Sequence, residues 1–579
     1  MTDYISKHKL LIIGTVLMAV FYWVMRLTNL TALPIFTDEA IYIRWAQIGG
    51  RDASWRFISL TDGKQPLFVW AMMITLRLIH DPLFAGRIVS VVSGFFSMIG
   101  IGLLSWELFR KKRTAVIASF LYLVTPFTLM YDRMALMDST LALFSIWSLY
   151  LAVILVRTGR LDAALLLGVS LGGGVLTKTS GFLTIYLLPL LFALFDFREK
   201  DWKMRLMRLM GLMGIAVAFS QIYYSILRLS PWFHMIHQKD GTFIYSVSEL
   251  AGDESLFSVR GVSLLFRFFI GNTRGIFDWT VRYLTPPVAM AAIASLFLSS
   301  KLVRKGSRIL SIVLTVVASY ATLLKIGMMY PAVSNAVYYV TKDTYRTLPW
   351  IFDGVFAALL ISGGAIALWN RQWKKLVLLG FYMIPAAGLA LFGKVLYPRF
   401  ILFMTIPLLV LAAWGIDWFF KQNRSSVRRT VFVLILLALP LYTDVKILFS
   451  IVTAPIPRSD SEQYVNDWPA GWGVREAVDF LEHKSQMSDV VVYTDGTFGL
   501  MPYGIEIYLV DNPRIKIKGI WPAPELYTDE MNADIAHVPT YYVSNQRQSL
   551  PPAWRVQEIA SYKKGTKNMY LRIYRLLAT

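Results

Sequence analysis

The sequence contains no cysteine and only a small share of charged residues. Its 579 residues include no Cys, and Asp, Glu, Lys and Arg together make up 16% of them. The absence of thiols excludes disulfides, zinc–thiolate centres, iron–sulfur clusters and cysteine nucleophiles. Soluble domains average about 25% charged and about 45–50% apolar residues, whereas this chain is 56% hydrophobic. That composition excludes a soluble enzyme.

A glycine-rich phosphate loop is also missing. In that motif of nucleotide-hydrolysing proteins a glycine precedes the lysine, whereas Thr177 precedes Lys178 here and no other stretch fits the motif. Nucleotide hydrolysis is therefore not expected.

Long apolar runs predict a polytopic α-helical membrane protein with about 13 transmembrane helices. A helix needs about 20 mostly apolar residues to cross a bilayer. The stretch Leu67–Ile79 is apolar but short, contains Arg77 and starts after Pro66, so we place it in the membrane interface, within a first outer loop over 28–85. The predicted spans lie near 10–27, 86–109, 114–131, 139–156, 161–177, 182–197, 209–227, 283–300, 309–325, 351–369, 376–392, 400–420 and 431–449.

Basic residues in alternate loops predict the orientation. With a cytoplasmic N-terminus, six loops lie inside and contain 22 basic residues against two acidic ones. The positive-inside rule favours this arrangement in the plasma membrane. These loops account for nearly all of the net charge of +21, so the charge indicates topology and no nucleic-acid partner. The loops are 110–113, 157–160, 198–208, 301–308, 371–375 and 421–429.

The composition changes after the last predicted span. Residues 450–579 carry 13 basic and 15 acidic residues, and short alternating apolar runs replace the long ones. We therefore predict a transmembrane domain over 1–449 and a small extracytoplasmic α/β domain over 450–579. Helical spacing marks Gly473–Lys484, and the expected strands are Val490–Tyr493, Ile505–Val510, Ile515–Ile517, Tyr541–Val543 and Met569–Tyr574.

Two carboxylates stand out on the predicted outer side. Thr37 or Asp38 can cap a helix that starts in the first outer loop, which would hold Asp38 ionised at the helix N-terminus and suit it as a general base. The plainer alternative is a capped amphipathic helix without chemistry. Asp138, in the short turn after the third span, is the second candidate, with helix capping as its alternative.

Cations gather on the same side of the membrane. Each has a plain alternative: interfacial snorkelling for Lys64, and helix capping for the turns that hold Arg133 and Lys178. His234 and His237 are three residues apart but lack a clear third ligand, so a hydrogen-bonded pair is expected and no metal site is assigned. The candidate cations are Lys64, Arg133, Lys178, Lys239 and Arg399.

Carboxylates and cations in one cavity at the membrane surface are what a lipid-linked phosphate requires. Cations bind the phosphate, and a carboxylate can take a proton from an attacking hydroxyl. The main alternative is a transporter or flippase of lipid-linked glycans, but such proteins commonly show repeated halves and charges near mid-bilayer. A third possibility, a ligand sensor, would not need thirteen spans.

Six short strings keep the order, spacing and membrane side of a known group. They are Asp38-Glu39, Lys64-Gln65-Pro66-Leu67 through Trp70, Ala85-Gly86-Arg87, Ala135-Leu136-Met137-Asp138, Leu176-Thr177-Lys178, and Pro398-Arg399-Phe400 followed by Pro407. In these strings the chain resembles the membrane glycosyltransferases of the C-type fold, particularly the aminoarabinose-to-lipid-A transferases and the protein O-mannosyltransferases.

The resemblance implies transfer of a sugar from a polyprenyl-phosphate carrier to an acceptor hydroxyl at the outer face, with inversion at the anomeric carbon. It makes Asp38 the general base, supported by Glu39, and gives Asp138 the role of orienting the acceptor or a cation. The donor phosphate would be held by Lys64, Lys178, Arg399 and Tyr42, with His237 and Lys239 as further contacts.

Other points are left open by the resemblance. Metal dependence varies across the fold, and no cofactor is implied. The acceptor could be a glycan, a lipid or a protein hydroxyl. Lys-Gln-Pro-Leu at 64–67, where the mannosyltransferases usually show His-Pro-Pro-Leu, makes a protein acceptor less favoured.

Overall fold

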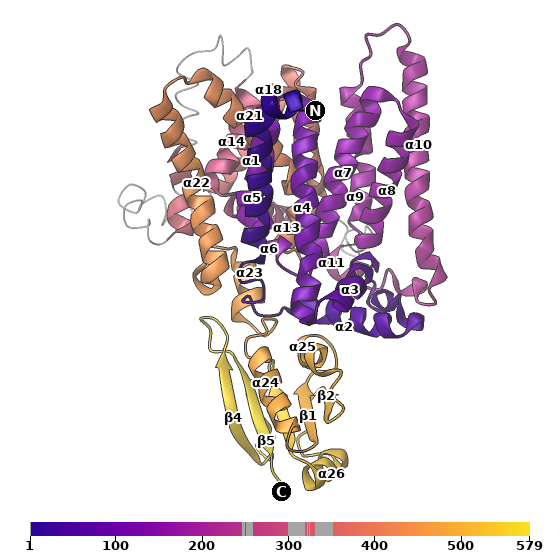
Figure 1. Cartoon of the computed structure of the whole chain (residues 1–579), viewed down its shortest axis with the longest axis vertical. Coiled ribbons are helices and arrows are strands. Elements are labelled where there is room, and N and C mark those ends of the chain that lie inside the picture. The colour runs from indigo at the N-terminus through magenta and orange to yellow at the C-terminus, as the bar shows by residue number, and fades with distance from the viewer. Residues whose placement is uncertain are drawn as a thin grey trace.

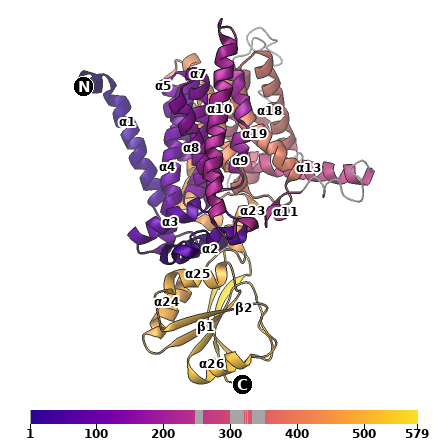
Figure 2. The ribbon, with the colours of Figure 1, turned by 90° about the vertical axis from the view of Figure 1, so that its right-hand side faces the viewer.

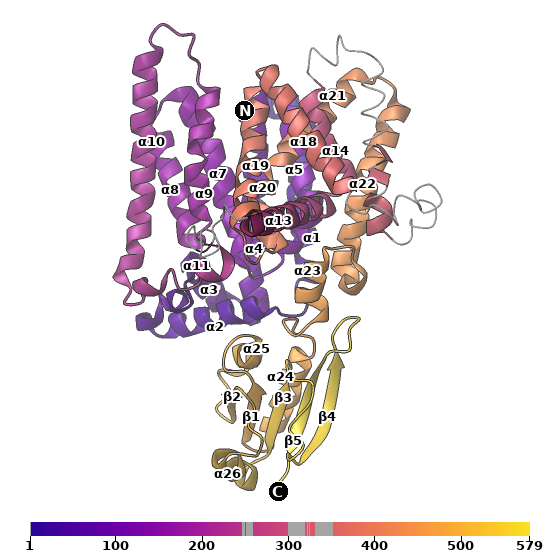
Figure 3. The ribbon, with the colours of Figure 1, turned by 180° about the vertical axis from the view of Figure 1, so that it is seen from behind.

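The computed structural model consists of a long helical bundle with a small mixed domain at one end (Figure 1). It describes residues 2–245, 249, 259–298, 319–320, 322–323, 325–330 and 351–578. In all three views the C-terminal domain lies beyond one end of the bundle, and the N-terminus lies at the opposite end (Figures 1, 2 and 3).

Apolar helices form the bundle. Among the described residues, six helices are long and apolar enough to cross a membrane, or seven if one bent pair counts as a span. The bundle helices are α1 Thr2–Leu27, α4 Pro82–Phe109, α5 Lys112–Val124, α6 Pro126–Asp132, α7 Met137–Thr158, α8 Leu161–Thr177, α9 Gly181–Tyr186, α10 Trp202–Ser225, α14 Pro286–Phe297, α18 Ile351–Trp369, α19 Trp373–Phe392, α20 Leu402–Thr405, α21 Pro407–Gln422 and α22 Ser426–Phe449.

The predicted membrane character is confirmed, but the count of 13 spans is not. The span expected at 114–131 is bent by 59° between α5 and α6, where Pro126 cannot donate to the helix ladder. The span expected at 182–197 is split into α9 and the 3-10 helix Leu188–Leu194. The span expected at 309–325 lies largely outside the described residues.

Two helices of the first outer loop lie across the end of the bundle that faces the C-terminal domain (Figure 1). They are α2 Thr37–Arg51 and α3 Leu67–Leu78. A third crosswise helix, α13 Val259–Leu284, lies across the bundle farther from the domain (Figures 2 and 3). The loop predicted over 228–282 thus contains a long helix that sequence reasoning did not assign.

The C-terminal domain is built on a five-stranded sheet with the order β2-β1-β3-β5-β4. β1 is parallel to both β2 and β3, whereas β5 is antiparallel to β3 and β4. The elements are α24 Val474–Ser485, β1 Val490–Asp495, α25 Leu500–Leu509, β2 Ile515–Ile520, α26 Asp529–His537, β3 Thr540–Ser544, β4 Val556–Lys563 and β5 Tyr570–Leu576.

One predicted strand of this domain is wrong. The segment Ile505–Val510 alternates apolar and polar residues, yet it forms the end of helix α25. This helix packs against α2: Arg44 donates to the Glu506 carboxylate at 2.7 Å, and the Gln47 amide donates to the Ile507 backbone carbonyl at 2.8 Å. A second packing surface, which a strand pattern does not reveal, therefore produced the alternation.

Candidate active site

The start of α2 places two adjacent carboxylates on different sides of the helix. Neither Thr37 nor Asp38 caps the helix, contrary to expectation. Instead the Phe36 backbone N–H donates to Glu39 Oε2 at 2.9 Å, and the Thr37 hydroxyl donates to the Pro469 carbonyl at 3.2 Å. Glu39 caps the helix from its third position, which leaves the Asp38 carboxylate available for other partners.

Glu39 lies in the protein interior and is fully satisfied there. Its side chain and that of Arg87 are 0% exposed, and Arg87 donates to both Glu39 oxygens at 2.8 Å. The Ala135 backbone N–H donates to Glu39 Oε1 at 2.7 Å. Glu39 therefore joins α2 to α4 and to the turn before α7.

Asp38 faces a group of cations. Arg399 Nη2 lies 2.9 Å from Asp38 Oδ2, and Lys64 Nζ lies 3.7 Å from Oδ1. The Asp38 side chain is 18% exposed. Burial alone would raise the pKa of Asp38, but the charges of Lys64, Arg399, Lys239 and Lys178 together lower that pKa below its ordinary value. Asp38 is consequently ionised at neutral pH.

A tight turn positions Lys64 beside Asp38. Gly63 has φ +66°, and the carbonyl oxygen of Ile236 would lie only 3.3 Å from an added Cβ, so glycine suits both the backbone conformation and the close packing. Lys64 Nζ lies 3.3 Å from Asp62 Oδ2. On the same packed turn Lys239 forms an ion pair with Asp62. Asp62 was not singled out from the sequence, although it stands two residues before Lys64.

Aromatic rings surround the cations of the site. Lys64 Nζ lies 4.8 Å from the centre of the Tyr42 ring. The Arg399 guanidinium lies 5.3 Å from the ring of Phe36 and 5.6 Å from that of Phe400. Such rings stabilise cations that are partly removed from water. They also keep Lys64 and Arg399 in fixed positions around Asp38.

A second ion pair completes the group. Asp138, near the start of α7, accepts from Lys178, directly after α8, at 2.6 Å. Their side chains are 5% and 24% exposed, and Lys178 Nζ lies 4.4 Å from the centre of the Phe400 ring. Gln65 donates to the Thr179 hydroxyl at 2.8 Å and thus ties the Lys64 loop to the Lys178 turn. Both predicted carboxylates therefore lie in one cluster.

We refer to this cluster as the anion site. It contains four cations and three carboxylates, which leaves one excess positive charge. One guanidinium nitrogen of Arg399, Nη1, is buried and has no hydrogen-bond partner among the described residues. A buried, unpaired guanidinium N–H is ready to bind an anion. The members are Asp38, Tyr42, Asp62, Lys64, Asp138, Lys178, Lys239 and Arg399.

Two further residues predicted to bind the donor phosphate, Arg133 and His237, are not counted among the members of the anion site. Arg133 turns away from it and donates to the carbonyls of Thr28 and Asn29, both at 2.7 Å. Its role is to hold the chain that leaves α1. His237 is exposed on the turn that packs against Gly63. No group of three His, Asp or Glu side chains suited to a metal ion occurs within the described part of the chain.

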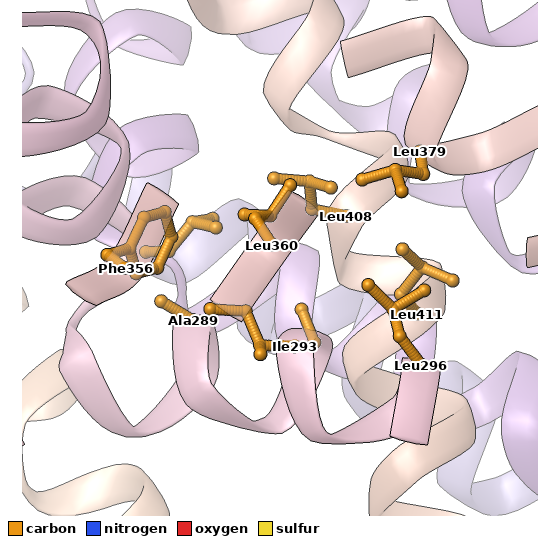
Figure 4. A pocket seen from close by; sticks show the side chains of 10 residues that line it. Ala289, Ile293, Leu296, Phe356, Leu360, Leu379, Leu408 and Leu411 are labelled. Atoms are coloured by element: carbon orange, nitrogen blue, oxygen red, sulfur yellow. The ribbon is translucent and has the colours of Figure 1, made fainter. Parts of the chain in front are cut away.

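A pocket lined only by apolar side chains lies within the bundle (Figure 4). α14, α18, α19 and α21 line most of it. Arg399 belongs to the 3-10 helix Pro398–Ile401, which leads through α20 into α21. The lining residues are Leu284, Ala289, Ala292, Ile293, Leu296, Phe356, Leu360, Leu379, Leu408 and Leu411. These side chains suit hydrocarbon and offer no group for chemistry.

Comparison with known proteins supports the resemblance read from the sequence. A family model described as dolichyl-phosphate-mannose-protein mannosyltransferase matches residues 63–224. That range includes Lys64, Asp138 and Lys178 but neither Asp38 nor Arg399. The undecaprenyl phosphate-alpha-4-amino-4-deoxy-L-arabinose arabinosyl transferase of Pseudomonas aeruginosa (strain UCBPP-PA14) is 29% identical over 216 residues.

That match covers 36% of this chain and 37% of the relative, so it spans little more than a third of the relative's length. The enzyme of the same name from Pseudomonas paraeruginosa (strain DSM 24068 / PA7) matches with the same identity and coverage.

A solved structure supports the same group at the level of the fold. ArnT from Cupriavidus metallidurans, bound to undecaprenyl phosphate, has a TM-score of 0.50 and 14% sequence identity, and the likeness covers 99% of each chain. At this identity the likeness shows a shared fold. The resemblance to membrane glycosyltransferases of the C-type fold is thereby confirmed.

Proposed function

We propose that this protein is a membrane glycosyltransferase that moves a sugar from a polyprenyl-phosphate carrier to an acceptor hydroxyl at the outer membrane face. The observation that carries the proposal is the anion site itself: an ionised carboxylate, Asp38, lies 2.9 Å from a buried guanidinium that retains an unpaired N–H. The names of the matching relatives supply the class of donor.

The site supports a single displacement at the anomeric carbon. The acceptor oxygen forms a bond to that carbon while the bond from the carbon to the phosphate oxygen breaks, which inverts the configuration. The acceptor proton passes to Asp38, and the phosphate leaves on its lipid carrier with the bonding electrons. Arg399, Lys64 and Lys178 stabilise the negative charge that develops on the leaving phosphate.

Asp38 and the donor phosphate would bind the same cations, so donor binding would change the basicity of Asp38. Without donor, Arg399 and Lys64 are paired with Asp38 and lower its pKa. A bound phosphate would compete for the same cations through Arg399 Nη1 and the lysine ammonium groups. The pKa of Asp38 would then rise towards the range in which a carboxylate accepts a proton more readily. Asp38 would become an effective base only beside its donor.

The membrane arrangement proposed from the loop charges agrees with the position of the site. α2, which carries Asp38, lies across the end of the bundle next to the C-terminal domain (Figure 1). The N-terminus lies at the opposite end. We therefore assign this end to the outer face of the plasma membrane and the N-terminus to the cytoplasm, with the helical part over 1–449 and the outer domain over 450–579.

The pH profile should reflect the lowered pKa of Asp38. Because the carboxylate of the free protein is already ionised well below neutral pH, kcat/KM for the donor should stay nearly constant as the pH falls from about 8 to about 5. The profile is measured with reconstituted protein. A steep loss of kcat/KM between about pH 7 and pH 6 would assign the base to a group with a higher pKa.

Lys178→Met should weaken use of the donor. It removes one cation of the site and leaves Asp138 buried without its partner, so kcat/KM for the donor should fall by roughly 10-fold to 100-fold, equivalent to about 1.4–2.7 kcal/mol. Lys203→Met is the matched control, because Lys203 is an exposed residue at the start of α10. If kcat/KM for the donor is the same in Lys178→Met and Lys203→Met, Lys178 does not bind the donor phosphate.

The decisive experiment uses purified protein in liposomes with radiolabelled polyprenyl-phosphate sugars and candidate glycan, lipid and peptide acceptors. Release of free polyprenyl phosphate together with labelled acceptor is expected. If the label crosses the bilayer while still attached to its carrier, the protein is a transporter and the proposed transferase activity is wrong. The labelled acceptor would also identify the acceptor class.

A further inference from the structure

The sheet of the C-terminal domain has a switch point between β1 and β3. From β1 the chain passes through α25 to β2 on one side, and then through α26 to β3 on the other side of β1. In open α/β sheets of this kind, ligands bind in the crevice at the carboxyl ends of the two strands that flank the switch point. In this domain the corresponding position lies between Asp495, which ends β1, and Asn545, which follows β3, and we refer to this position as the crevice.

Polar groups converge at that crevice. Asp495 Oδ2 accepts from the backbone N–H groups of Asn545, Gln546 and Arg547, at 2.8, 2.7 and 2.8 Å. Lys564, directly after β4, is 0% exposed and donates to Asn545 Oδ1. The Asp495 carboxylate thereby fixes the backbone at the end of β3, and Asn545 holds the Lys564 ammonium.

The crevice is occupied by the chain's own segment 467–471. The Trp468 carbonyl accepts from Lys564 Nζ at 3.2 Å and from Asn545 Nδ2 at 3.0 Å. The Ala470 carbonyl accepts from the same Lys564 ammonium. One buried lysine therefore binds two backbone carbonyls of a segment that precedes the domain's first helix.

The opposite edge of this segment pairs with the start of the Asp38 helix. The Thr37 N–H donates to the Pro469 carbonyl at 3.1 Å, and the Gly471 N–H donates to the Ile35 carbonyl at 2.7 Å. Phe36 and Ala470 form an antiparallel bridge between these bonds. Residues 467–470 form a turn in which the Ala470 N–H donates to the Asp467 carbonyl at 3.0 Å, and the carbonyls of 468 and 470 face Lys564 while that of 469 faces Thr37.

We propose that Lys564 is a positioning residue of the active site: by holding segment 468–470 in the switch-point crevice, it fixes the start of α2 and with it the Asp38 carboxylate. The proposal rests on the proposed function. It gives the outer domain a role in catalysis, with its ligand crevice used to hold a piece of the same chain.

The link consists of consecutive contacts between Lys564 and the backbone next to Asp38. Its loss should let the first turn of α2 move relative to Arg399, which stands on the 3-10 helix Pro398–Ile401 and also packs against the Phe400 ring. A small misplacement of a reacting group can cost a large factor in rate. The donor cations should be less affected, because Lys178 is held by Asp138 and Arg399 by Phe400 on other elements.

The test compares full-length Lys564→Met with Lys563→Met, the exposed neighbour at the end of β4. Hydrogen exchange is measured on the peptide that covers 35–41, and kcat and donor KM are measured in liposomes. In Lys564→Met the Thr37 amide should exchange at least about 10-fold faster. kcat should fall by about 10-fold with donor KM changed less than about twofold. Lys563→Met should match wild type.

Lys564→Met leaves buried carbonyls without a donor and could unfold the domain, so Asn545→Ala is the second variant. It removes the amide contacts to the Trp468 carbonyl and to Lys564 Nζ but leaves the lysine and its bonds to segment 468–470 in place, and a smaller change of the same kind is expected. A folded Lys564→Met protein with wild-type exchange at Thr37 and unchanged kcat would overturn the proposal. A raised donor KM with unchanged kcat would overturn it as well. If wild type transfers no sugar, the proposed function fails, while the exchange data still decide whether Lys564 holds α2.

Discussion

Asp38→Asn is expected to lower kcat by about 10²–10⁴-fold, because a positioned general base contributes a factor of this size. Asparagine keeps the shape of the side chain but cannot accept the proton of the attacking hydroxyl. Its amide oxygen can still accept a hydrogen bond from the Arg399 guanidinium, but it lacks the negative charge of the native carboxylate, which lies 2.9 Å from that guanidinium. The donor should still bind, since the cations released from Asp38 remain free for the phosphate.

The measurement separates the two effects. Single-turnover transfer gives the chemical step, and binding of labelled polyprenyl phosphate gives the affinity for the carrier. Asp62→Asn is the matched control, because Asp62 is a carboxylate of the same anion site, paired with Lys64 and Lys239. We expect Asp62→Asn to change donor affinity more than rate. Transfer at the wild-type rate by Asp38→Asn would exclude Asp38 as the base.

Glu39→Gln should destabilise the protein by about 3–5 kcal/mol, the cost of breaking a buried ion pair from one side. The substitution leaves the Arg87 guanidinium, which is 0% exposed, without a compensating charge. It also weakens the acceptor of the Phe36 and Ala135 backbone N–H groups. Thermal unfolding in a fixed detergent or nanodisc should therefore show a clearly lower midpoint than wild type.

Two further variants test the cause of that loss. Glu506→Gln breaks the pair with Arg44, whose side chains are 18% and 20% exposed, and should cost less than about 1 kcal/mol. The double variant Glu39→Met with Arg87→Met removes both charges and should recover part of the stability. A stable Glu39→Gln protein with no transfer activity would instead make Glu39 a member of the reaction site.

Sequence reasoning predicted the members of the anion site well where each charge stands at the end of an apolar run. Asp138, Lys178 and Arg399 are such residues, because an ionisable group at the edge of a membrane span needs a specific reason to be there. Asp62 was not predicted, because the outer loop around it is polar and one more charged residue there gives no signal. Arg133 shares the sequence position of a site residue, but its side chain direction depends on tertiary packing.

The limits for the fold have similar physical causes. Apolar length predicts that a segment enters the bundle, but it does not tell whether the helix continues. Pro126 bends one expected span, and the segment with Pro189 splits another. The segment Ile505–Val510 has the alternation of a strand because both α2 and the sheet of the domain bury it. Contacts between distant elements decided the last of these cases, and a single sequence does not contain them in readable form.

The contacts of Thr37 and Asp38 also order events during synthesis. Asp38 pairs with Arg399 only when that residue, at the entrance to α20 and α21, has been made, and the start of α2 meets Pro469 later still. A ribosome emits the chain from the N-terminus, and domains generally form in that order. A nascent or truncated chain that ends before Arg399 would therefore insert its early helices into the membrane but would have no transfer activity.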